Sequence, residues 1–286
     1  CYMYGTGVGQ DYAQAVEWFR KAADQGNVSA QLELGRCYKK GKGVDQDYAQ
    51  AVEWFRKAAD ETTWFDEGNA EAQVELGICY MEGKGVDQDY AQAAKRFRKA
   101  AKQEDAKAER MLGICYMEGK QVDQYDAVAV EWFRKAAEHG DSKAQFQLGM
   151  CYKEGRGASQ DDSEAAKWFG KAAGQGNSKA QFQLGMCYKE GKGVAQDYVK
   201  AVELLRKAAR QDNAEAQCEL GICYETGKGV GRDESRAGEW FEKAAERGNA
   251  KAQYKLGVRY ELGVGGCCDY DKADELLKKA AAQGYE

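Results

Sequence analysis

The sequence of 286 residues contains no proline, and this absence, with 34 glycines and evenly spread charge, favours many short helices punctuated by glycine over disorder. It also has no block of like charge. Lys and Arg total 42 against 47 Asp and Glu, a formal net charge of −5, so nucleic acid is not expected as a partner. No apolar run approaches the roughly 18 residues that span a bilayer, and membrane insertion of this segment is not expected.

Histidine is almost absent, and this scarcity argues against an enzyme. His139 stands at the end of an expected helix, where Gln25 and Gln175 stand elsewhere, and is expected to be exposed. Every Ser-His, Cys-His or His-rich metal site would depend on this one residue. Gly41-x-Gly43 follows a helix and lacks a third spaced glycine, so it is interpreted as a turn and not a phosphate loop. We predict no catalytic residues, no cofactor and no metal site.

The dominant feature that is present is an internal repeat. Leu-Gly recurs with one step of 42 residues and then five steps of 36, beginning at Leu34, Leu76, Leu112, Leu148, Leu184, Leu220 and Leu256. We predict one solenoid domain over 1–286. It comprises a partial repeat over 1–26, mainly a second helix, and full repeats over 27–68, 69–104, 105–140, 141–176, 177–212, 213–248 and 249–286, the last resembling a cap.

Each half of the repeat has the period of a helix. Ala30, Leu34, Cys37 and Tyr38 fall at i, i+4, i+7 and i+8 on one stripe, and Asn27 is placed to cap that helix. We call this first helix of each repeat helix A.

The second helix of the repeat, helix B, has the same kind of stripe between Ala51 and Ala59. Asp47 and Gln50 have the spacing of a capping box. Gly26 and Gly41 follow the expected helix ends, where glycine adopts a left-handed conformation without steric cost.

Gly35 lies inside helix A, and its equivalent recurs in all seven full repeats. A glycine there costs ~1 kcal/mol relative to alanine, so its recurrence predicts a close helix crossing. One helix pair cannot bury its own apolar stripes, whereas stacked pairs bury them against their neighbours. The predicted fold class is therefore all-α, a solenoid of helix-turn-helix repeats of about 36 residues.

The unit reads Ala-x-x-x-Leu-Gly-x-x-Tyr, Gly-x-Gly-Val, Asp-Tyr-x-x-Ala and Trp-Phe-x-Lys-Ala-Ala, and it resembles the Sel-1-like repeat, a relative of the tetratricopeptide repeat. The resemblance covers the whole chain. It implies a right-handed α-α superhelix with helix A lining the concave side. It also implies adaptor or scaffold roles, in membrane-protein degradation complexes in eukaryotes and in signalling, cell-envelope or host-interaction assemblies in bacteria. It brings no catalytic residues.

Several repeats depart from this pattern. Trp54 of helix B is replaced by Arg96 and by Leu204 in two later repeats, which weakens a regular aromatic ladder. The last repeat carries Arg259 where the others carry cysteine. A polar residue in a terminal repeat is expected to face solvent as part of a cap.

Seven of the ten cysteines share one position before the helix A tyrosine: Cys1, Cys37, Cys79, Cys115, Cys151, Cys187 and Cys223. Equivalent sites on successive repeats lie about a helix diameter, ~10 Å, apart, whereas disulfides need Cα separations under ~7 Å. Buried reduced thiols and a cytoplasmic location are therefore favoured, with any upstream signal outside this sequence.

A cysteine-rich bacterial branch of the resembled family joins its two helices by one disulfide per repeat. Only Cys218 lies near such a position, and its expected partner region, Lys207 to Ala209, has no cysteine. Cys267 and Cys268 are adjacent in the last turn. They are interpreted as incidental loop residues, with a redox or metal role as the alternative.

Two rows of helix A vary between repeats and lie off the core stripe. The candidate partner contacts in these rows are Leu32, Arg36, Val74, Ile78, Arg110, Phe146, Met150, Phe182, Met186 and Tyr254. Phe146, Met150, Phe182 and Met186 are predicted to form the apolar centre of a peptide or helix site on the concave face. The alternative is that both rows pack between repeats.

A six-residue insertion accounts for the single step of 42 and carries Trp64 and Phe65. It is expected to extend helix B and shield a neighbouring groove, or else to present an aromatic anchor to a partner.

The sequence predicts a non-catalytic protein–protein interaction scaffold whose partners are proteins or peptides. The alternative is a secreted or cell-envelope repeat protein that binds peptidoglycan or carbohydrate fragments, with weak hydrolase activity; it would carry a signal peptide or oxidised cysteines. The partner's identity and the oligomeric state stay open.

Overall fold

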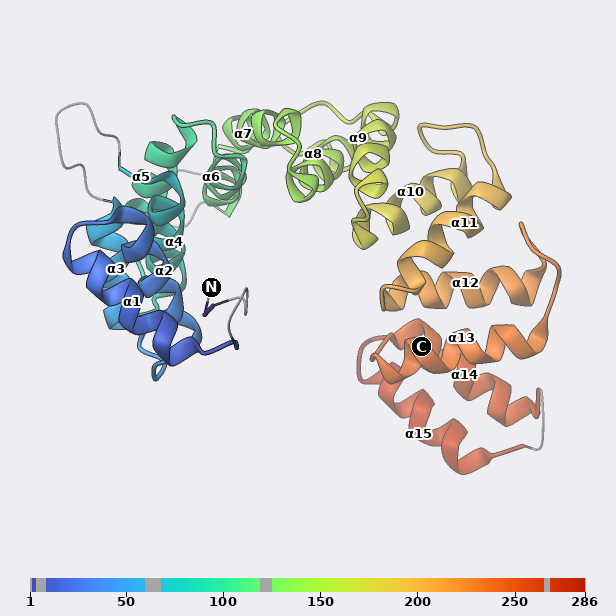
Figure 1. The fold of residues 1–286 in the computed structure, drawn as a ribbon. Coiled ribbons are helices and arrows are strands. Elements are labelled where there is room, and N and C mark those ends of the chain that lie inside the picture. Colours follow the sequence, from blue (N-terminus) through green and yellow to red (C-terminus); the bar gives the residue numbers. More distant parts are fainter. Residues whose placement is uncertain (1, 4–8, 60–67, 119–124, 265–267, 286) are drawn as a thin grey trace. The chain divides into compact units, whose positions relative to one another are not determined.

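A computed structural model describes residues 2–3, 9–59, 68–118, 125–264 and 268–285, and the regular structure within these ranges is entirely α-helical (Figure 1). The helices are α1 Tyr12–Asp24, α2 Val28–Lys40, α3 Tyr48–Ala59, α4 Ala70–Glu82, α5 Tyr90–Ala101, α6 Ala106–Glu118, α7 Asp126–Glu138, α8 Ser142–Glu154, α9 Asp162–Gly174, α10 Ser178–Glu190, α11 Tyr198–Ala209, α12 Ala214–Thr226, α13 Glu234–Glu246, α14 Ala250–Leu262 and α15 Tyr270–Ala281.

The chain divides into two compact units, Cys1–Ala144 and Gln145–Glu286. In the first unit, α2 packs on α3, α4 on α5 and α6 on α7, and each of these A helices also packs on the B helix before it. The second unit repeats the arrangement with α10 on α11, α12 on α13 and α14 on α15. This stacking of consecutive helix pairs confirms the predicted all-α repeat fold.

The helix ends follow the predicted turn chemistry. The Asn27 side chain accepts a hydrogen bond from the Ala30 N–H at 2.9 Å, which caps α2. Gly41 ends α2 with φ +64°, in the left-handed region. The Asp47 carboxylate accepts from the Gln50 N–H at 3.0 Å and caps α3. Short polar caps and glycine ends thus set the two helices of each repeat.

The glycine inside helix A marks a close crossing, as predicted. A Cβ added to Gly35 would lie 2.6 Å from Cε1 of Phe55, and an added Cβ at Gly77 would lie equally close to Phe97. Because Phe55 and Phe97 are fully buried, their rings cannot move aside into solvent. The phenylalanine of helix B therefore fills the space that a helix A side chain would need.

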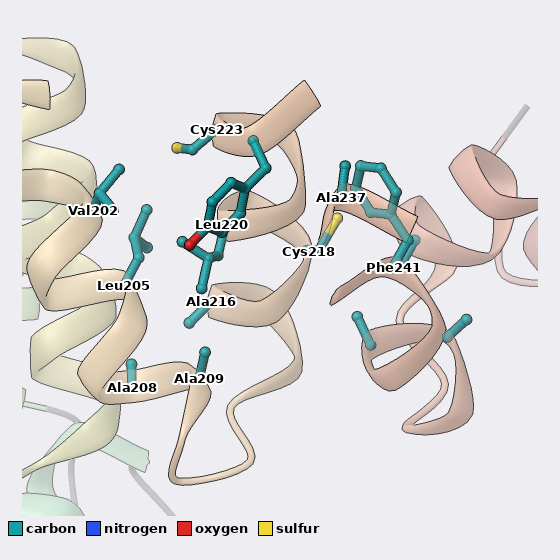
Figure 2. Packing of buried hydrophobic residues seen from close by; sticks show 14 of the residues in the cluster. Val202, Leu205, Ala208, Ala209, Ala216, Cys218, Leu220, Cys223, Ala237 and Phe241 are labelled. Carbon is teal, nitrogen blue, oxygen red and sulfur yellow. The ribbon is translucent and has the colours of Figure 1, made fainter. Parts of the chain in front are cut away.

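The core consists of small and medium apolar side chains shared by neighbouring helices (Figure 2). In the second unit, Leu205 of α11, Leu220 of α12 and Phe241 of α13 are each fully buried in one cluster with Ala216 and Cys218. Alanines let the helix backbones approach closely, and the larger side chains fill the space between them.

A buried glutamine joins α10 and α14 to the helices on either side. The Gln181 Nε2 donates to the carbonyl of Ala173 at 3.2 Å, and the Gln181 Oε1 accepts from Gln211 Nε2 at 2.9 Å. Gln253 makes the equivalent bonds to Ala245 and Gln283, at 3.2 and 2.9 Å. The amide thus bonds to the last turn of the preceding helix B and to the glutamine that follows helix B of the same repeat. Both its donor and its acceptor therefore have partners.

The expectation that Arg259 faces solvent is wrong. Its residue surface is only 7% exposed, and its guanidinium donates to the Glu234 carboxylate and the Glu234 carbonyl, both at 2.7 Å. Gly238 occupies a helix B position held by Val52 and Val202 in other repeats, and an added Cβ there would lie 3.6 Å from the Arg259 Nη2. Because α13 has no side chain at this place, α14 can bury a long polar residue against it.

Candidate partner-binding face

The candidate contacts lie on the side of each helix A that points away from its core stripe. In α10 this side carries Lys179, Phe182, Gln183, Met186 and Lys189. We call it, with the equivalent side of the other A helices, the helix A face.

In the first unit the apolar candidates differ in exposure. Leu32 and Val74 are 5% and 1% exposed and belong to core clusters. These two residues therefore pack between repeats, which was the alternative to partner contact. Ile78 is half-buried and packs on the edge of a core cluster. Ile78 is thus the apolar candidate of this unit that offers some surface to a partner.

The two arginine candidates of the first unit are already engaged within the protein. Arg36 contacts Glu33 at 2.6 Å and Glu71 at 2.5 Å. Arg110 contacts Asp141 at 3.1 Å. These guanidinium groups tie neighbouring parts of the unit together.

In the second unit the four residues of the predicted apolar centre are all half-buried. Phe146 and Met150 lie on α8, and Phe182 and Met186 lie on α10. The Phe146 ring packs tilted against Phe169, with centroids 5.9 Å apart. Phe146, Met150 and Phe182 pack against core clusters, and all four side chains keep part of their surface accessible.

The hydrogen bond from Lys153 Nζ on α8 to Gln183 Oε1 on α10, 2.7 Å long, shows that these two faces adjoin. Tyr254 lies further along, on α14, where its ring packs against Tyr285 with centroids 5.5 Å apart. The structure thus brings together α8 and α10, while Tyr254 is occupied by the C-terminal segment.

The helix A face of the first unit carries a charge ladder that the sequence reasoning missed. Glu75 of α4 contacts Lys39 of the preceding helix A at 2.8 Å and Lys107 of the following helix A at 3.2 Å. Burial alone would raise the pKa of Glu75, but the two ammonium groups together hold it below its usual range. A buried carboxylate therefore joins three successive A helices.

The same ladder recurs in the second unit. Glu219 of α12 pairs with Lys189 of α10 and with Lys251 of α14, the latter at 2.7 Å. Burial opposes ionisation of Glu219, and the two lysines outweigh it and lower the pKa. Glu75 and Glu219 occupy the same repeat position, just before the Leu-Gly pair.

At this ladder position α8 and α10 carry Gln147 and Gln183 instead of glutamate. Lys153 meets only the amide oxygen of Gln183 in the bond described above, and Lys179 is exposed. Comparison of the repeats in register shows the Glu-to-Gln change. Only the structure shows that the glutamates at this position pair with lysines of neighbouring A helices.

Seven of the described cysteines fit the prediction of buried thiols outside disulfides. Cys37, Cys79, Cys115, Cys151, Cys187, Cys218 and Cys223 are buried, and Cys268 is exposed. Burial raises the pKa of the Cys115 thiol to about 12 and that of Cys37 to about 11. Such thiols are poor nucleophiles. Cys1 and Cys267 lie outside the described residues, as do Trp64 and Phe65 of the insertion.

His139 is partly exposed, as predicted, but it has a partner. Its Nδ1 lies 2.9 Å from the Glu109 Oε2, and Glu109 is 3% exposed. Over the part of the chain that the structure describes, no group of three or more His, Cys, Asp and Glu residues is placed to hold a metal ion. Within those same ranges, no helix combines the length and apolar character that crossing a membrane requires.

Helix pairs repeated in register, with glycine turns and a face of varying side chains, define a helical-repeat solenoid. The chain belongs to the Sel1 repeat family, whose pattern matches residues 1–27, 28–62, 70–105, 106–141, 142–177, 178–213, 214–249 and 250–285. This family generally mediates protein–protein interactions, and its solenoids are typically non-enzymatic scaffolds.

Two solved structures show the likeness in three dimensions. One is a protective antigen with an SLR fold, present in uropathogenic Escherichia coli strains; it is 39% identical with a TM-score of 0.85, over 99% of this chain and 60% of the antigen. The other is a Sel1 repeat protein from Oxalobacter formigenes, 32% identical with a TM-score of 0.75, over 87% of this chain and 96% of that protein. The chain thus spans 60% of the antigen's length. Comparison with curated proteins gave no match.

Proposed function

We propose that this chain is a non-catalytic scaffold that binds a peptide or protein partner along the helix A face of its second unit. The observation that carries the proposal is the half-buried state of Phe146, Met150, Phe182 and Met186 on the adjoining helices α8 and α10. Large apolar side chains held by a rigid frame and left partly open are the usual anchors for a peptide or helix.

Other features support the same proposal. The chain belongs to a family of interaction modules, and its one histidine is paired with Glu109. The thiol at Cys115 has a strongly raised pKa. The chemistry available on the described surface therefore favours recognition over catalysis.

The proposal predicts that neutral polar substitutions at Phe182 and Met186 abolish binding and leave the fold intact. Random 16-residue peptides displayed on phage would be selected on the native protein, and the enriched peptides would be synthesised and measured by fluorescence anisotropy. Phe182→Asn and Met186→Asn should each weaken binding at least tenfold, because truncating a central aromatic or Met anchor removes a large part of the binding free energy.

Val199→Asn is the matched control, because Val199 is also apolar but lies on helix B of its repeat, α11, and is 59% exposed. It should leave the affinity unchanged. Circular dichroism on all three variants separates lost binding from lost folding. If Phe182→Asn unfolds the protein and a folded Met186→Asn binds as well as the parent, these residues belong to the core and the proposed site is wrong.

A further inference from the structure

The charge ladder of the helix A face is interrupted at the helices that carry the apolar centre. We infer that the partner of this face is an acidic peptide segment whose carboxylates replace the ones missing from α8 and α10. The inference rests on the proposed function, because it assigns the chemical class of the partner of that same site.

Where the ladder is complete, each lysine on this face has a carboxylate partner. Glu75 neutralises Lys39 and Lys107 from the two flanking A helices. Glu219 does the same for Lys189 and Lys251. Both carboxylates are buried, and both keep a lowered pKa because the lysines surround them.

Where the ladder is interrupted, the lysines remain and the carboxylates are absent. Lys153 occupies the repeat position of Lys39 and Lys189, but it meets the neutral Gln183. Lys179 occupies the position of Lys107, whose equivalent carboxylate site on the preceding helix A is here Gln147. An amide oxygen accepts a hydrogen bond from an ammonium group but does not neutralise its charge, so α8 and α10 carry uncompensated positive charge.

The nearby acids do not remove this excess. Glu190 at the end of α10 contacts Lys192 at 2.8 Å in the following turn. Glu154 holds the same place at the end of α8. Glu215 of α12 holds the repeat position of Lys107 and Lys251, so the basic strip ends at α10. The centre of the strip keeps its lysines together with the four apolar side chains.

This combination determines the kind of partner that fits. Phe146, Met150, Phe182 and Met186 favour apolar side chains, and Lys153 and Lys179 favour carboxylates that lie beside them. Complementary charge at the rim of an apolar site raises the association rate and disfavours basic competitors. An acidic peptide with interspersed apolar residues meets both requirements.

The test uses the peptides selected on the full-length native chain. The enriched sequences should carry net negative charge together with aromatic or aliphatic residues, and their Kd should rise at least fivefold between low and physiological salt because salt screens the charges. The double variant Gln147→Glu plus Gln183→Glu places a carboxylate at the ladder positions beside Lys179 and Lys153. It should weaken binding at least tenfold without lowering the thermal midpoint, because the new carboxylates pair with the lysines and repel the peptide.

Gln14→Glu plus Gln92→Glu is the matched control, because it adds the same two charges on the exposed sides of the B helices α1 and α5. It should change the affinity by less than twofold. A single-stranded oligonucleotide is added as a competitor and should not displace the peptide.

The outcomes separate failure of the acidic-partner inference from failure of the proposed scaffold function. Neutral or basic peptides that still lose binding with Phe182→Asn would refute the acidic partner and leave the scaffold function standing. Acidic peptides whose affinity survives Gln147→Glu plus Gln183→Glu, or that an oligonucleotide displaces, would also refute it. A selection without any peptide that depends on Phe182 would count against both proposals.

Discussion

At the scale of single residues, one buried polar position distinguishes a repeat from its neighbours. Helix A places glutamine there in Gln145 and Gln181, and each accepts a hydrogen bond from a glutamine at the end of helix B, at 2.9 Å. In the third full repeat the same pair is Glu109 and His139. A neutral amide pair has become an ionisable pair in a site of nearly the same burial.

This substitution predicts a pH-dependent stability. Burial raises the pKa of Glu109, and the opposing attraction of His139 and Lys135 is weaker, while Asp105 adds to the rise. The folded chain then binds a proton more strongly than the unfolded chain. Stability therefore falls as pH rises from the ordinary glutamate value of 4.5 through the raised pKa, and the cost is complete above it.

Glu109→Gln should raise the thermal midpoint at pH 7, and the gain should shrink toward pH 4, where the carboxyl is largely protonated in both states. Thermal unfolding followed by circular dichroism at both values measures the difference. Gln145→Glu is the reverse control in the second unit, and it should destabilise more at pH 7 than at pH 4. Equal effects at the two pH values would contradict a burial cost.

At the scale of the element, the crossing of helix A over helix B depends on one glycine and one aromatic ring. An added Cβ at Gly149 would lie 2.6 Å from Cε1 of Phe169, which is fully buried. At Gly185 the partner is Leu205 instead, and the nearest atom, its Cγ, lies at 3.2 Å. Glycine-to-alanine substitution therefore creates a severe overlap with a side chain at Gly149 and only a mild one at Gly185.

Gly149→Ala should therefore destabilise the chain by about 1–3 kcal/mol, the usual cost of overpacking. Gly185→Ala should be close to neutral, because alanine in a helix interior gains ~1 kcal/mol over glycine and offsets the milder overlap. Urea unfolding measures both, and Gly149→Ala with Phe169→Leu should recover part of the loss. If Gly149→Ala and Gly185→Ala lower the free energy of unfolding equally, the Phe169 ring does not determine the close approach of helix A and helix B.

At the scale of the whole molecule, the repeat buries one thiol after another along the chain. Seven described cysteines are buried and only Cys268, among those the structure describes, is exposed. Water and reagents reach the buried thiols only when helix pairs separate, so their reactivity reports on the stacking of helix pairs within each unit.

A colorimetric thiol reagent at pH 8 should gain at least seven reactive thiols when the purified protein is unfolded in guanidinium. Cys268→Ser should lower the rapid native reaction and leave the slow fraction unchanged, which identifies the exposed thiol. Fewer than seven additional thiols would mean that some of these cysteines are oxidised or accessible, and would favour the secreted alternative.

The repeat structure could be predicted from the sequence because its causes are local or periodic. Asn27, Gly41 and the stripe from Ala30 to Tyr38 fix the ends and the buried side of helix A within a few residues of chain. The recurrent Gly35 likewise indicated the crossing that the ring of Phe55 confirms. Local capping and a regular period were sufficient for the fold class.

For side chains off that stripe, burial and polar partners depend on the tertiary structure and could not be predicted from the repeat pattern. Leu32 and Phe182 share a repeat position, yet Leu32 is buried and Phe182 is half-buried. Arg259 enters the core only because Gly238 leaves room for it, and Lys153 lacks a carboxylate only because Gln183 stands on the next helix A. Gly238 lies 21 positions from Arg259 and Gln183 lies 30 positions from Lys153, and each pair touches only after the helices stack, so no pattern within one repeat contains these outcomes.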